Sequence, residues 1–154
     1  MSILEQLLRR NSVEDEMTKG KNPQAFDTKK EKELLSTYSR YKGRRNSSEY
    51  FSAMPMIDFY YKFRNLDNKY LDECIKYCNI CLSCLDSPDM RTDINGGIHI
   101  PAFKKLVIIY ENQKEYDKAA FYAEQALKYT KYNSDDAVYY SKKMKTLMNK
   151  KFSK

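Results

Sequence analysis

The strongest pattern in this sequence is a pair of consecutive helical stripes between Phe103 and Tyr132. In the first stripe, apolar side chains recur every three or four residues, as on one face of a helix. After a short polar break, small and apolar side chains recur in the same way. The residues of the two stripes are Phe103, Leu106 and Tyr110, then Tyr116, Ala119, Ala123, Ala126 and Leu127. Because alanines allow helices to approach closely, the pattern predicts a tight antiparallel helical hairpin.

The same periodicity predicts helices over most of the chain. Glycine and proline, with four residues each, are too few for the many turns of a sheet protein. We expect helices at residues 2–10, 28–43, from 46, 68–85, 100–113, 116–131 and 134–150. Pro55 should kink the helix that opens at Asn46-x-x-Glu49, or start a second helix there. Residues 86–97 are predicted to form a loop. The expected fold is all-α, with antiparallel helical hairpins and a C-terminal capping helix.

The segment that begins at Phe103 resembles the tetratricopeptide repeat, a helix–turn–helix unit of 34 residues. Phe103 takes the family's first aromatic position, Leu106 its leucine and Tyr110 its tyrosine. Ala119 and Ala126 take the two alanines of the second helix. The resemblance implies stacked hairpins whose first helices line a concave binding surface.

The repeat is degenerate, and a weaker copy precedes it. Val107, Lys114 and Lys131 stand where the family usually has a small residue, glycine and proline. Upstream, three cysteines correspond in spacing to the alanines of the second helix: Cys74, Cys78 and Cys81. The resemblance covers roughly residues 50–132, and residues 134–150 would form a polar-faced capping helix.

The cysteines Cys74, Cys78, Cys81 and Cys84 admit three interpretations: core packing, a metal site or a redox thiol. On one helix the outer pair lies about 15 Å apart along the axis, too far for one tetrahedral ion, so packing is favoured. His99 is the only histidine and is expected to be a structural or surface residue. No phosphate-binding loop or nucleophile motif is present. We therefore expect no enzyme activity, no metal and no cofactor.

Two domains of unequal size are expected: an N-terminal arm at 1–27, and a single helical domain at 28–154. The arm carries an apolar stripe of Ile3, Leu4, Leu7 and Leu8. So short a helix is not stable alone in water, and we therefore expect the stripe to dock into a groove. The groove would belong either to its own domain or to a second copy of the chain, and the second case would make a homodimer. No secretory signal and no run of apolar residues long enough to span a membrane is found, and the cysteines fit a reducing compartment. We expect a cytoplasmic protein.

The favoured function is a protein- or peptide-binding adaptor. If the resemblance holds, Lys104, Ile108 and Glu111 would face the concave surface of the repeat. The alternative is a nucleic-acid-binding protein, because the net charge is +7 and basic residues gather towards both ends of the chain. The candidate contacts to a polyanion are Arg44, Arg45, Lys128, Lys131, Lys142, Lys143 and Lys145.

Overall fold

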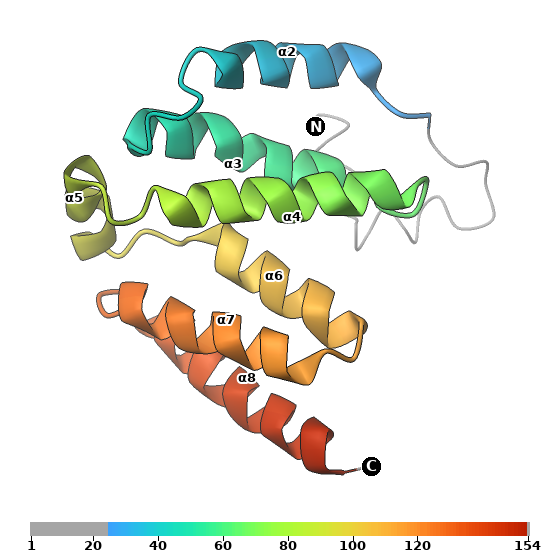
Figure 1. The fold of residues 1–154 in the computed structure, drawn as a ribbon. Coiled ribbons are helices and arrows are strands. Elements are labelled where there is room, and N and C mark those ends of the chain that lie inside the picture. Colours follow the sequence, from blue (N-terminus) through green and yellow to red (C-terminus); the bar gives the residue numbers. More distant parts are fainter. Residues whose placement is uncertain (1–24, 154) are drawn as a thin grey trace.

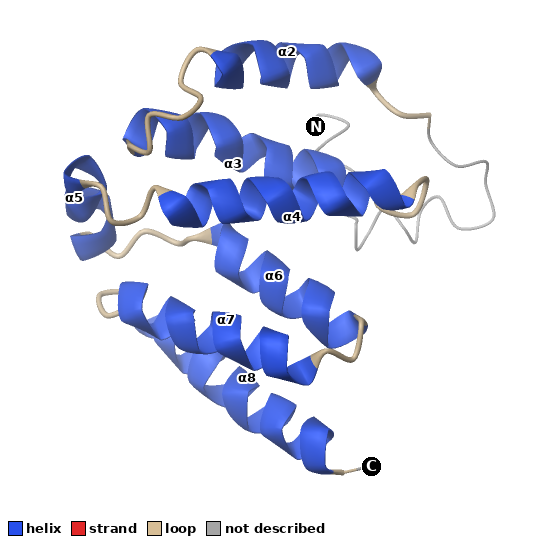
Figure 2. Cartoon of the chain, viewed as in Figure 1, coloured by secondary structure: helices blue, strands red, loops and turns tan. Residues whose placement is uncertain are grey.

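The computed structural model describes residues 25–153, which consist of helices and turns and contain no strand. The helices are α2 (Thr28–Ser39), α3 (Ser47–Lys62), α4 (Asn68–Ser83), α5 (Arg91–Asn95), α6 (Pro101–Asn112), α7 (Tyr116–Tyr129) and α8 (Ser134–Phe152). Figure 2 shows that helices dominate this part of the chain. The predicted all-α class is confirmed.

The helices form a stack of hairpins (Figure 1). Helix α3 packs against α4, and α6 packs against α7; contacts between α4 and α6 join the two hairpins. Helix α2 covers α3 at one end of the stack, and α8 covers α7 at the other. The hairpin predicted from the alanine stripe is therefore present as α6–α7, and α8 occupies the place of the predicted capping helix.

Small side chains lie at the centre of both hairpins. On α7, Ala119, Ala123 and Ala126 are fully buried. On α4 the corresponding residues, Cys74, Cys78 and Cys81, are buried to the same degree. Larger side chains from α3 and α6 fill the space beside them, among them Met56, Phe59, Phe103 and Leu106. The predicted packing role of both small-residue stripes is confirmed.

The turn between α2 and α3 is organised by the carboxylate of Glu49, which is almost fully buried. Asn46 caps α3 by accepting a hydrogen bond from the Glu49 N–H at 3.1 Å, as its position predicts. The Glu49 carboxylate turns back and accepts bonds from the Tyr38 hydroxyl at 2.6 Å and from the N–H groups of Gly43 and Arg45 at 3.0 and 2.7 Å. Burial alone would raise the pKa of Glu49, but these bonds outweigh burial and lower the pKa.

Some details differ from the sequence-based prediction. The sequence predicts either a kink or the start of a second helix at Pro55; α3 continues through Pro55, so the second alternative is wrong. Pro55 has no amide hydrogen, so the carbonyl that loses its helical partner belongs to Phe51, a residue that is 40% exposed. Helix α2 ends at Ser39, before the predicted end. The prediction of a loop at 86–97 is wrong, because this segment contains a 3-10 turn at Pro88–Met90 and the short helix α5.

The predicted N-terminal helix at 2–10 lies outside the described residues. Its stripe consists of Ile3, Leu4, Leu7 and Leu8, so docking of these residues stays a prediction. Within residues 25–153, every helix is too short or too polar to cross a membrane.

Replacing Glu49 by Gln should lower the free energy of unfolding by about 1–3 kcal/mol, because the amide leaves a buried donor unsatisfied. The pKa of Glu49 is lowered by folding, so its stabilising effect is complete above the pKa of the unfolded chain and is lost as pH falls through the folded-state pKa. Chemical unfolding at several pH values should show a difference between wild type and variant that is largest near neutral pH. The exposed Glu33→Gln serves as control, and a Glu49→Gln effect that does not vary with pH would contradict this account.

Two substitutions in the second hairpin should act in opposite directions. Ala119→Leu should lower the free energy of unfolding by about 1–3 kcal/mol, because Ala119 is fully buried and a larger side chain would overpack the contact between the helices. Lys114 has a φ of +61°, in the left-handed region, so Lys114→Gly should relieve strain and stabilise by up to about 1 kcal/mol. Thermal melts of both variants test this, and equal losses of stability would show that the proposed register is wrong.

Candidate functional site

The residues predicted for the concave surface of α6 lie beside the chain's own helix α8. The Lys104 amine is 4.8 Å from the centre of the Tyr139 ring of α8, within the range of a cation–π contact. Ile108 is half-buried. Glu111 also reaches α8 through its carboxylate. The charged groups of this predicted surface are therefore engaged by the capping helix.

Glu111 is the centre of an ion-pair network between α6 and α8. Its carboxylate lies 2.8 Å from the Lys143 amine and 2.5 Å from the Lys150 amine, and its side chain is 11% exposed. Burial alone would raise the pKa of Glu111, but the bonds to the two lysines lower it. A carboxylate held between two ammonium groups is ionised at neutral pH, so it orients α8 and has no free proton for acid catalysis.

The basic residues proposed to contact a polyanion do not form one patch. Arg44 and Arg45 lie in the turn after α2, at the opposite end of the stack from α8 (Figure 1). Lys143 is paired with Glu111. The others are exposed at the end of α7 or on α8: Lys128, Lys131, Lys142 and Lys145.

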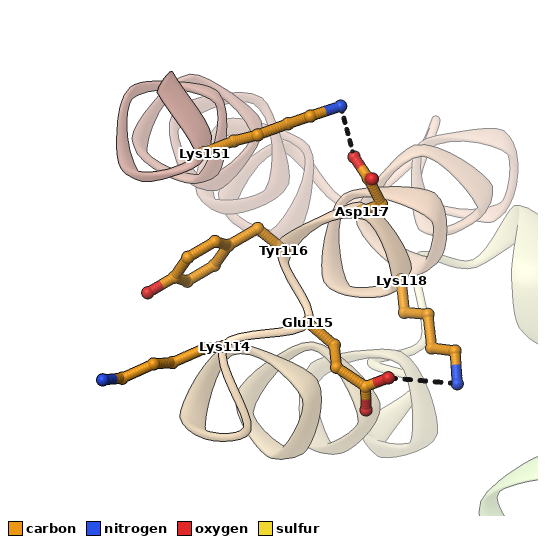
Figure 3. A pocket seen from close by; sticks show the side chains of 6 residues that line it. All are labelled: Lys114, Glu115, Tyr116, Asp117, Lys118 and Lys151. Atoms are coloured by element: carbon orange, nitrogen blue, oxygen red, sulfur yellow. Dashed lines mark ion pairs between the residues drawn. The ribbon is translucent and has the colours of Figure 1, made fainter. Parts of the chain in front are cut away.

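A hollow of about 450 Å³ lies at the α6–α7 turn (Figure 3). Its lining is Lys114, Glu115, Tyr116, Asp117, Lys118 and Lys151. The Lys151 amine is 2.7 Å from the carboxylate of Asp117, and the Lys118 amine is 3.3 Å from that of Glu115. Four of the five charged groups in this hollow thus neutralise one another, which leaves little charge for a ligand.

A second hollow, of about 340 Å³, lies between the α3–α4 turn and the end of α6. We call it the amide hollow, and its lining is Tyr61, Arg64, Asn65, Asn68, Leu71, Ile109, Asn112 and Gln113. Four of these side chains are carboxamides, and none has a side-chain hydrogen bond to another residue within 25–153. This cluster was not predicted from the sequence, although asparagine and glutamine occur at the α3–α4 turn and at the end of α6.

Tyr61 forms the aromatic side of the amide hollow between two cations. The Arg64 guanidinium lies 3.9 Å from the ring centre, and the Lys105 amine lies 4.0 Å from it. Lys105 is also paired with Asp58 at 3.3 Å. Arg64 donates one bond to the Tyr61 carbonyl at 2.8 Å and has no ion pair with a residue that the structure describes. Its remaining N–H groups can therefore bind a carboxylate.

The cysteines and the histidine lie away from the amide lining. All four cysteines are buried and unpaired, which confirms the prediction that they pack in the core. Burial raises the pKa of the Cys81 and Cys84 thiols, so these are poor nucleophiles. Residues 25–153 contain no cluster of three ligands suited to a metal ion. The His99 Nδ1 lies 2.8 Å from Asp136 at the start of α8.

Glu111→Gln should loosen α8 and lower the free energy of unfolding by about 1–3 kcal/mol, because two lysines lose a partly buried partner. Asp117→Asn is the matched control: it removes an ion pair to the same helix, but the Asp117 side chain is 77% exposed. Such a pair contributes about 0–1 kcal/mol, so the control should unfold almost like wild type. Denaturant titration measures both, and equal effects would mean that burial of Glu111 does not matter.

Comparison with protein-family models, curated proteins and solved structures finds no match to this chain.

Proposed function

We propose that this protein is a non-catalytic protein- or peptide-binding adaptor that holds a segment of its partner in the amide hollow. The observation that carries the proposal is that four exposed carboxamides, which have no side-chain hydrogen bond within residues 25–153, line one hollow together with Arg64. The four carboxamides are Asn65, Asn68, Asn112 and Gln113.

Each peptide group of a bound segment has an N–H that needs an acceptor and a carbonyl that needs a donor. A carboxamide side chain supplies both. The free N–H groups of Arg64 add a site for an acidic side chain or a terminal carboxylate. Leu71 and Ile109 are the aliphatic residues of the lining; Leu71 is half-buried and Ile109 is 3% exposed. The hollow lies at the lower end of the size range of ligand sites, which suits a few residues of a peptide.

Two features support the proposal that the hairpins are tetratricopeptide-like. Lys114, at the position where the family usually has glycine, has a φ of +61°, a conformation that glycine adopts without strain. Ala119 and Ala126, at the positions of the family's alanines, are fully buried. The four cysteines without disulfide bonds are compatible with a reducing compartment, which supports the proposal of a cytoplasmic location.

The alternative of nucleic-acid binding has less support. Three lysines of α8 are engaged by carboxylates of α6 and α7: Lys143, Lys150 and Lys151. A protein that binds phosphates through counterion release needs free cations in one patch. The basic residues proposed to contact a polyanion are instead divided between the turn after α2 and the α7–α8 end of the stack.

Selection of binders from a random peptide library tests the proposed function. Peptides that bind the full chain should carry Asp, Glu or a free C-terminal carboxylate. Arg64→Ala should weaken their binding by about tenfold or more, because it removes a charge-assisted hydrogen bond. Asn68→Ala and Asn112→Ala should weaken binding by smaller factors, measured by fluorescence anisotropy.

Arg91→Ala, an exposed arginine of α5, is the matched control and should bind the peptides like wild type. Failure to enrich any peptide, or equal binding by Arg64→Ala, would contradict the proposal. Retention on single-stranded DNA with a steep salt dependence, lost in a Lys142→Ala/Lys145→Ala variant, would favour the nucleic-acid alternative.

A further inference from the structure

Helix α8 has one face packed on the domain and one face open. Tyr140 and Leu147, on the packed face, are each 1% exposed. On the opposite face Val138, Met148 and Phe152 are 51%, 55% and 72% exposed. At about 100° per residue, these three positions fall within an arc of about 80° on one side of the helix. Helix α8 is the last layer of the stack, so none of residues 25–153 covers them (Figure 1).

The open face is hollowed and carries three exposed apolar side chains. Met144, Lys145, Met148 and Asn149 line a hollow of about 350 Å³ on α8. Three of the eight large hydrophobic side chains that are exposed within the described residues belong to this single face. Scattered apolar side chains are normal on a surface, but a stripe along one helix indicates an interaction site.

The lysines of α8 are divided between its two faces. Three point towards α6 and α7 and pair with carboxylates there: Lys143, Lys150 and Lys151. Lys142 and Lys145 lie on the open face, and neither has an ion-pair partner among residues 25–153. The apolar stripe is therefore accompanied by two free positive charges.

We propose that the open face of α8, formed by Val138, Lys142, Lys145, Met148 and Phe152, docks an amphipathic helix of another protein. The apolar stripe of that helix would be flanked by Asp and Glu. A straight stripe along a helix is matched by a second helix that packs at a small angle to it. Acidic flanks would pair with the two free lysines and provide specificity. This site is separate from the amide hollow and does not depend on the proposed function.

Charge also favours this acidic helix over two other possible occupants of the open face, a second copy of α8 and the chain's own segment 2–10. A second copy of α8, packed face to face, would bring Lys142 and Lys145 of both copies together and be repelled. The chain's own segment 2–10 has suitable leucines, but it ends in Arg9 and Arg10 and would add positive charge. An acidic helix from another protein is the occupant that complements the face.

A library of helical peptides tests this proposal. Each peptide carries a fixed stripe of leucines, while the flanking positions vary among Glu, Gln and Lys. Selection on the full chain should enrich Glu at the flanks. The best peptide should bind at least about tenfold more weakly to Met148→Ser/Phe152→Ser, because apolar anchors dominate such interfaces. Lys142→Glu/Lys145→Glu should reverse the preference from Glu to Lys.

Phe121→Ser is the matched control: Phe121 on α7 is 52% exposed, close to Met148, but lies on a different helix. It should bind like wild type, and so should Arg64→Ala, which separates this site from the amide hollow. The variants change exposed residues, and their melting temperatures verify that they fold. The proposal is overturned by three outcomes: no enrichment, enrichment without a charge preference, or a homodimer in sedimentation that Met148→Ser dissociates.

Discussion

Close approach of helices along small side chains is the constraint on which the rest of this structure depends. Each of the two hairpins places three small, fully buried residues of its second helix against its first helix. They are Cys74, Cys78 and Cys81 on α4, and Ala119, Ala123 and Ala126 on α7. Because the backbones can approach there, aromatic and aliphatic side chains of α3 and α6 fill the core beside them. Cysteine serves as a small apolar residue in this setting, and burial keeps Cys81 protonated by raising its pKa.

Local patterns predicted the helices well, because periodicity, caps and turn residues act within a few positions of the chain. The Asn46 cap and the Ala119 stripe are examples. The amide hollow could not be found in the same way. Asn65 and Asn112 belong to different hairpins, and the packing of α6 against α4 and α3 brings their turns together. The role of Glu49 was missed for a similar reason: its spacing indicated a capping box, whereas its carboxylate bonds to Tyr38 of α2.

Charge pairing reduces the repulsion among the lysines of α8 in this protein of net charge +7. Glu111 holds two lysines of α8, and Asp117 holds a third, so most of the positive charge that faces the domain is compensated. The same pairing sets the orientation of α8, because Lys143 and Lys150 are two turns apart and both must reach one carboxylate. The lysines left on the other face are free as a consequence of this orientation.

The terminal helices α2 and α8 differ in the side chains that they carry at the two ends of the stack. At the α2 end, buried tyrosine–carboxylate bonds close the structure: the Tyr38 hydroxyl donates to Glu49, and the Tyr60 hydroxyl donates to Glu31 of α2 at 2.6 Å. At the α8 end, the outer face has apolar side chains and no comparable bonds to another element within residues 25–153. A helix that only closed a stack would be expected to carry a polar outer face. The exposure of Met148 and Phe152 is therefore better explained by a surface that another helix covers than by a cap alone.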